Sequence, residues 1–242
     1  MHFKLFAVVV SLLIPGIWSI CKTIEELDQC AYQLSFLENR EIPVPYNEAD
    51  VLQSCKQSQS GIKCLRSHTE ECMTGMIKNI FLNAIVTLEK HINNRCDSKP
   101  HRDEFIKHVT CFHDPAKAEA IRLCTDRYLV IMEKTSELDP AYQLGGACCS
   151  VQAMHDCAVD KFRSNCNEES GDYFEELLGE VNEGNNQTVC AQFNSIRACD
   201  SNYDSKIWSQ FKSIMASNDP LIIKAHRYKS VIPPVIKMFS GA

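Results

Sequence analysis

Two stretches of this chain space their cysteines in nearly the same way: CKQSQSGIKCLRSHTEEC at residues 55–72 and CCSVQAMHDCAVDKFRSNC at residues 148–166. Repetition at a fixed interval is the sequence signature of tandem structural units. We therefore expect two cysteine-rich helical units, residues 21–100 and 101–200, and a C-terminal region, residues 201–242. A shift of 93 or 94 positions relates five cysteines of each half: Cys30, Cys55, Cys64, Cys72 and Cys96 to Cys124, Cys148, Cys157, Cys166 and Cys190.

The apolar residues repeat at the same interval as the cysteines. Their steps of three and four are the spacing of one helix face, and glycine and proline, at nine each, are sparse enough to allow long helices. We therefore expect an all-α protein in which disulfides staple two tandem copies of a small helical unit, followed by a C-terminal helix and an extended tail. A shift of 93 relates these apolar residues: Ile80, Phe81, Ala84, Ile85 and Leu88 to Tyr173, Phe174, Leu177, Leu178 and Val181.

Capping residues predict where several helices begin. Thr23 with Glu26 has the spacing of a capping box, and Asp114 before Pro115 is an N-cap followed by a first-turn proline. Thr69, followed by two glutamates, is expected to open the longest helix of the chain.

The cysteines are even in number, and thiols in such numbers survive an oxidising compartment by pairing. No Cys-x-x-Cys occurs, and the histidines do not cluster with cysteines at ligand spacing, so disulfides are favoured over a zinc site. We expect Cys149 to pair with Cys199, and the other six cysteines of each half to pair in one shared pattern that spacing alone does not fix. The fourteen disulfide cysteines are Cys21, Cys30, Cys55, Cys64, Cys72, Cys96, Cys111, Cys124, Cys148, Cys149, Cys157, Cys166, Cys190 and Cys199.

The first residues have the pattern of a secretory signal peptide, residues 1–19. Lys4 precedes an apolar run that Pro15 and Gly16 end, and the run is too short to span a bilayer. A formal net charge of −6 argues against nucleic acid or anionic membranes as partners. The sequence therefore predicts a secreted, extracellular protein without a membrane span.

One segment resembles the active-site helix of secreted phospholipases, in which a Cys-Cys pair precedes His-Asp and a further cysteine. Here His155 lies six residues after Cys149 rather than three, which turns the side chain by about 300° on a helix. Cys157 also follows Asp156 directly, and the glycine-rich calcium loop is missing. We therefore expect a non-enzymatic protein with no catalytic residue and no cofactor.

Three histidines lie around Cys111. His101 and His108 are seven residues apart and would share one helix face, whereas His113 falls beside Pro115. A metal site is one interpretation, and a solvated polar face is the favoured one.

Two further segments carry possible functions. Asn186 begins the acceptor sequon Asn-Gln-Thr and is expected to be glycosylated on a loop, next to Gly184 and Asn185. The tail after residue 217 mixes basic and apolar residues, and Pro233-Pro234 is expected to hold it extended. Packing of the tail across the two units is favoured over a free arm that docks on a partner.

The run Cys64-Leu-Arg-Ser-His-Thr-Glu-Glu-Cys72, the run Cys124-Thr-Asp-Arg-Tyr128 and the adjacent pair Cys148-Cys149 resemble a family of secreted, cysteine-rich helical proteins of arthropods. The resemblance covers most of the mature chain and rests on cysteine order. It implies an extracellular compartment and a helical fold, and it supplies no activity and no catalytic residues.

These features favour a secreted binding protein. Stapled helices with wide apolar stripes can hold a small apolar ligand between them. The alternative is a signalling, inhibitor or effector protein that acts through protein–protein contact, which an exposed apolar patch without an internal cavity would favour. The candidate ligand-lining residues, each of which could equally be ordinary core, are Met73, Met76, Phe81, Tyr173 and Phe174.

Overall fold

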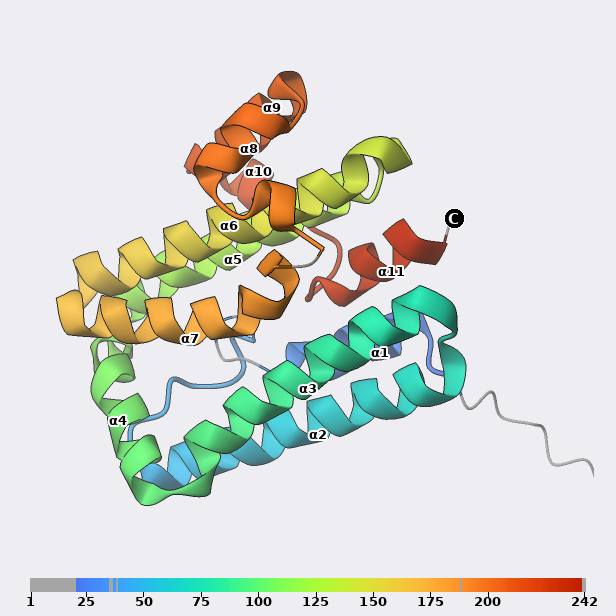
Figure 1. Ribbon diagram of the computed structural model, residues 1–242. Helices are drawn as coiled ribbons and strands as arrows, with labels where there is room; N and C mark the ends of the chain where they lie inside the picture. The colour runs from blue at the N-terminus through green and yellow to red at the C-terminus, as the bar shows by residue number, and fades with distance from the viewer. Residues whose placement is uncertain (1–20, 35–36, 38, 188, 241–242) are drawn as a thin grey trace, which may run out of the picture.

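A computed structural model describes residues 21–34, 37, 39–187 and 189–240 (Figure 1). The signal peptide expected at residues 1–19 lies outside these residues. Within the described part, helices make up the regular structure and no strand is present, so the all-α prediction is confirmed. The helices of the two halves are α1 (Ile24–Tyr32), α2 (Glu48–Cys72), α3 (Gly75–Asp97), α4 (Lys99–Val109), α5 (Pro115–Thr135), α6 (Pro140–Asn165) and α7 (Glu168–Gln187). Those of the C-terminal region are α8 (Ile196–Asn202), α9 (Ser205–Ala216), α10 (Pro220–Ile223) and α11 (Ile232–Ser240).

Local sequence sets most of the helix starts. The capping box predicted at Thr23 and Glu26 is present, because each side chain accepts from the backbone N–H of the other residue. Asp114 caps α5 ahead of Pro115. The helix start expected at Thr69 is wrong: Thr69 is buried inside α2, and its hydroxyl donates to the carbonyl of Leu65 at 2.8 Å. The chain turns instead at residues 73–75, where Gly75 has φ +64°, a conformation that glycine adopts without strain.

Each half of the chain has a long central helix between two neighbours. In the first half α2 packs against α1 and α3, and in the second α6 packs against α5 and α7. α4 connects the halves at one end of the molecule (Figure 1).

The disulfides join corresponding positions in the two halves. The first half contains Cys21–Cys72, Cys30–Cys64 and Cys55–Cys96, and the second contains Cys111–Cys166, Cys124–Cys157 and Cys148–Cys190. Cys149 pairs with Cys199. The shared pairing pattern and the Cys149–Cys199 bond are therefore confirmed. The internal duplication that would explain them stays a prediction.

One of the buried apolar clusters is built from both halves of the chain. Phe162 of α6 is its centre, stacked on Phe174 at 3.5 Å between ring centroids and met edge-on by Phe112 at 4.8 Å. Val51 of α2 and Val44, from the segment before α2, are buried in the same cluster. The two halves thus bury their apolar faces against one another.

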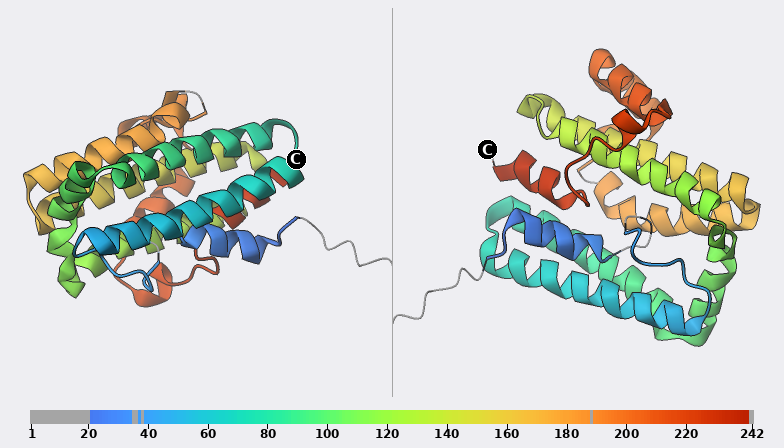
Figure 2. Two further views of the ribbon diagram at one scale, coloured as in Figure 1. Left: turned by 90° about the horizontal axis from the view of Figure 1, so that it is seen from below. Right: turned by 180° about the vertical axis from the view of Figure 1, so that it is seen from behind.

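The C-terminal region packs back onto the two halves, as the favoured interpretation of the tail predicted. α11 lies between α1 and α5, which the view from behind in Figure 2 shows clearly. The extended path expected at Pro233 and Pro234 is wrong, because both prolines lie in the first turn of α11. First-turn N–H groups have no helical acceptor, so two prolines there sacrifice no hydrogen bond.

The Cys149–Cys199 bond should carry much of the stability of the C-terminal helices. It closes a segment with a sequence separation of 50 residues, and it is buried beside Trp208 and Phe211. Replacing Cys149 and Cys199 together by alanine should lower the free energy of unfolding by about 2–4 kcal/mol, measured by denaturant unfolding. The six other disulfides should remain in the non-reducing peptide map of this variant. Unchanged stability, or a wild-type map that joins Cys149 to another cysteine, would contradict the assignment.

Candidate functional site

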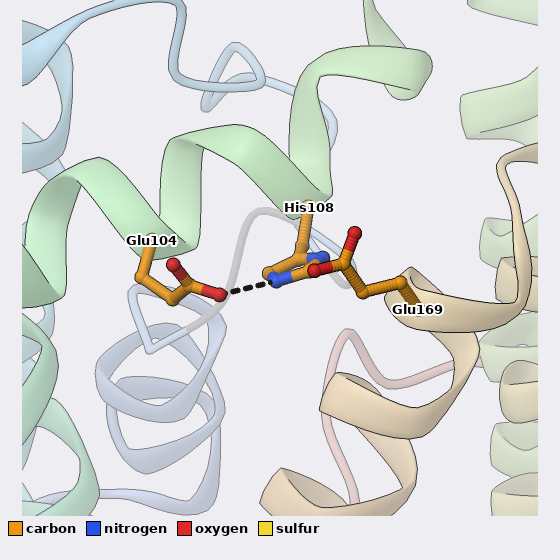
Figure 3. A group of neighbouring side chains, drawn as sticks. All are labelled: Glu104, His108 and Glu169. Atoms are coloured by element: carbon orange, nitrogen blue, oxygen red, sulfur yellow. Dashed lines mark hydrogen bonds and ion pairs between the residues drawn. The ribbon is translucent and has the colours of Figure 1, made fainter.

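Three side chains that could share a ligand meet where α4 faces the start of α7. Glu104 and His108 lie one turn apart on α4, and Glu169 lies in the first turn of α7 (Figure 3). The Nε2 atom of His108 is 2.7 Å from Oε1 of Glu104. One imidazole nitrogen and one oxygen from each carboxylate lie within 4.8 Å of one another.

Covalent and helical constraints together bring these groups to one place. An i,i+4 spacing puts Glu104 and His108 on one face of α4. The Cys111–Cys166 disulfide then ties the turn after α4 to the residue pair that precedes α7. α7 therefore begins beside the C-terminal end of α4, and Glu169 comes within reach of His108.

The imidazole of His108 is held firmly while the two carboxylates are exposed. Its side chain is only 2 % exposed, and its ring stacks on Tyr173 with 4.4 Å between centroids. Ser170 lies 3.2 Å from the Nδ1 atom of His108, and a hydroxyl can either donate to that nitrogen or accept from it. Glu104 and Glu169 are 51 % and 63 % exposed. The site therefore lies at the surface with a buried ring at its base.

Lys107 supplies the positive charge beside this site. Its ammonium forms an ion pair with Glu169 and lies 3.8 Å from Glu104. The hydrogen bond between Lys107 and Glu169 raises the pKa of Lys107 and lowers the pKa of Glu169. Apart from the imidazole, the two carboxylates and the ammonium carry a net charge of −1, so the cluster can attract a cation.

The sequence anticipated this cluster only in part. His108 is buried rather than part of a solvated face, and its partners are glutamates rather than His101 or His113. His101, at the start of α4, pairs with Asp97, and both side chains are exposed. His113 stacks on Tyr46. The Glu-x-x-x-His spacing on α4 was a readable signal, whereas Glu169 lies too far along the chain to be linked to it.

The candidate ligand-lining residues are distributed over the interior rather than around one hollow. Phe174 belongs to the central apolar cluster, Phe81 is buried on α3, and Tyr173 covers His108. Met73 is half-buried at the end of α2, and the side chain of Met76 lies outside the described part. Two surface hollows are lined by other residues.

The first of these hollows is a groove of about 240 Å³ between α2 and α3. Ile62 and Ile92 form its floor, and an ion pair of 2.5 Å between Arg66 and Glu89 bridges its rim. The groove is smaller than the 300–1,000 Å³ that is typical of pockets for small molecules.

The second hollow, of about 460 Å³, includes His155 and Asp156 of the phospholipase-like segment. The Nδ1 atom of His155 lies 3.2 Å from Oδ1 of its neighbour Asp156. Arg163, which also lines the hollow, forms ion pairs with Asp172 and Glu175. The His-Asp pair is thus two adjacent residues of α6, of which His155 is half-buried and Asp156 is exposed.

Asn186 lies in the last turn of α7, not in a loop as expected from its neighbouring glycine. The helix continues through residues 184–187 because a glycine lowers helix stability without forbidding the conformation. Glycosylation of Asn186 stays a prediction.

The most exposed large apolar side chain of the described region lies on α10. Leu221 is 86 % exposed and Ile222 is 40 % exposed, whereas the next residue, Ile223, is buried. The backbone before α10 is fixed by Arg127, which donates two hydrogen bonds to the carbonyl of Ser217 at 2.7 and 3.0 Å. Asp219 caps α10 by accepting from the N–H of Leu221 at 2.9 Å. The short helix therefore presents two apolar side chains on a fixed backbone.

Buried or half-buried carboxylates hold the segment between α10 and α11. Asp28 accepts from the N–H groups of Lys229 and Ser230 at 2.9 and 2.7 Å. Glu133 accepts from the N–H groups of Arg227 and Tyr228 at 2.6 and 2.7 Å. The first carboxylate belongs to α1 and the second to α5, so the segment ties the two halves together.

His226 of this segment and Asp126 of α5 form a third link between the tail and the helices, this time between two side chains. Burial by itself would raise the pKa of Asp126, but hydrogen bonds from His226 and Arg40 hold it below its usual value. The ring of His226 faces two acceptors, the carbonyl of Tyr228 at 2.8 Å and the carboxylate of Asp126 at 3.5 Å. Only the protonated imidazole donates from both nitrogens. The hydrogen bond to Asp126 accordingly raises the pKa of His226.

This link predicts a pH dependence of stability. Because the folded-state pKa of His226 is raised, its contribution is complete below the unfolded value of 6.5 and is lost as pH rises through the folded-state pKa. His226→Gln should therefore reduce the unfolding free energy more at about pH 5 than at about pH 8, measured by denaturant unfolding. His113→Gln serves as the control, at a histidine outside the tail whose ring meets the carbonyl of Pro45 and the ring of Tyr46. Equal destabilisation by His226→Gln at both pH values would contradict the charged link.

Comparison of the chain with protein-family profiles, with curated proteins and with solved structures gives no match. None of the helices in the described ranges is long and apolar enough to cross a membrane. The seven disulfides are those of a protein that folds in an oxidising compartment.

Proposed function

We propose that this chain is a secreted, non-enzymatic binding protein that acts through contact with another protein, and that α10 is its contact point. The observation that carries the proposal is the exposure of Leu221 and Ile222 on a backbone fixed by Arg127 and Asp219. Apolar side chains held rigidly in water gain free energy when a partner covers them. A fixed backbone also leaves little conformational entropy to lose on binding.

The surroundings of α10 indicate the chemistry of the partner. Lys224 and Arg227 follow the two apolar residues and are exposed. An apolar pocket with an acidic rim on another protein would match this surface, because the pocket takes Leu221 and the rim faces the basic side chains. A buried apolar anchor surrounded by polar contacts is the usual arrangement of a binding hot spot.

A photo-crosslinking experiment tests this proposal. A photoreactive residue at position 221 of the full secreted chain should capture one extracellular protein, and the same residue at position 86 on α3 should not. Val86 is the matched control because it is also an exposed apolar residue, at 54 %. Unlabelled wild-type protein should compete for capture, whereas Leu221→Asp should compete at least about tenfold less well, since an anchor residue contributes 2 kcal/mol or more. Equal capture from both positions, or full competition by Leu221→Asp, would contradict the role of α10.

The groove between α2 and α3 favours a second candidate function, the carriage of a small apolar ligand. Its floor of Ile62 and Ile92 is apolar, and its rim of charged and amide side chains could orient the polar end of such a ligand.

Native mass spectrometry of the secreted protein tests this second candidate function. Extra mass that leaves on denaturation, and that Ile92→Lys abolishes, would support a carrier, whereas a mass explained by the polypeptide and glycan would exclude a retained ligand.

A further inference from the structure

We propose that Glu104, His108 and Glu169 form a binding site for a divalent transition metal of the zinc type. No part of the proposed function requires this site, which lies on α4 and α7 rather than on α10 or in the α2–α3 groove. It would offer one imidazole nitrogen and two carboxylate oxygens, a donor set that suits zinc.

The buried histidine is the feature that points to a metal rather than to a surface ion pair. Its Nε2 atom lies 2.7 Å from the Glu104 carboxylate, and the Glu169 carboxylate lies beside the ring (Figure 3), while the other nitrogen, Nδ1, lies 3.2 Å from Ser170. A metal-ligating histidine commonly makes a hydrogen bond through its other nitrogen, which fixes the ring and its tautomer. Because the Ser170 hydroxyl can accept as well as donate, the ring can carry its proton on Nδ1 and leave Nε2 free for a metal.

The two carboxylates can adjust to the metal without disturbing the core. Ligand atoms around zinc lie about 2.0–2.2 Å from the ion, so Glu104 must move away from His108 by a few tenths of an ångström. Both glutamates are exposed and have the rotamer freedom for this shift. Tyr173 and Ser170 keep the ring in place meanwhile.

Lys107 is the competitor that tunes the site. Its ammonium sits against Glu169 and near Glu104, which is the charge compensation that a metal would replace. A bound dication would repel this ammonium at close range, so Lys107 lowers metal affinity. Three protein ligands leave a coordination position for water on the exposed side of the cluster.

Metal titration of the full secreted chain, without an affinity tag, tests the site. The cysteines of the described region are all paired, so no free thiolate among them competes for the metal. Calorimetric titration with Zn²⁺ should reveal one saturable site, and Co²⁺ should give visible absorption bands that Zn²⁺ removes. Glu104→Gln and Glu169→Gln should each weaken binding by about tenfold or more, because even the loss of an outer-shell partner costs 10- to 100-fold.

Two further variants separate ligation from general electrostatics. Glu168→Gln removes the same charge one residue away, on a side chain that pairs with Arg163 instead, and should leave affinity nearly unchanged. Lys107→Gln should tighten binding several-fold. Thermal unfolding provides a second measurement, since Zn²⁺ should raise the Tm of the wild type more than that of Glu169→Gln.

Several results would overturn the proposal. One is the absence of saturable binding to the wild type. Another is an equal loss of affinity in Glu168→Gln and Glu169→Gln, which would mean non-specific attraction by acidic residues. Weaker binding in Lys107→Gln would mean that the ammonium supports the carboxylate geometry rather than competing with a metal.

Discussion

The rest of this structure depends on the disulfides that link each of two long helices, α2 and α6, to the segments around it. Every one of the seven disulfides has a cysteine in or directly after one of these helices. The disulfides fix α2 to α1 and α3, and fix α6 to α5 and to the segment after α7, which limits the unfolded chain and sets the register of packing. The turn after α4 and the start of α7 are held together by one of these bonds, so the Glu104–His108–Glu169 cluster follows from the same constraint.

The disulfides alone do not join the two halves into one body. That connection comes from the aromatic cluster around Phe162, from the segment before α2, and from carboxylates that hold the tail. Asp28 and Glu133 accept pairs of backbone N–H groups, which gives hydrogen-bond partners to an irregular segment that has no helical acceptors. The tail can therefore cross the two halves without helical hydrogen bonds of its own between α10 and α11.

The candidate sites lie where this scaffold leaves side chains uncovered. α10 is fixed through Arg127 and yet exposes Leu221 and Ile222, and the α4–α7 cluster has a buried ring beneath two exposed carboxylates. The aromatic residues that helical stripes marked as candidate ligand contacts are mainly used to fill the interior. A disulfide-linked scaffold that exposes side chains on α10 and at the α4–α7 cluster suits the recognition of a partner better than the enclosure of a large ligand.

The sequence by itself determined the all-α class, the Cys149–Cys199 bond, the use of one cysteine pairing pattern by both halves, and the local helix starts at Thr23 and Asp114. These depend on periodicity, spacing and hydrogen bonds within a few residues, all of which can be read along a chain. It missed the break at Gly75 and the helical prolines of α11, because acidic residues after Thr69 and a Pro-Pro pair fit more than one local structure. Only the tertiary structure decided which groups meet: Glu169 with His108, Asp126 with His226, and Asp28 with Ser230. Such pairs are far apart along the chain, and their contact depends on how helices pack rather than on any local signal.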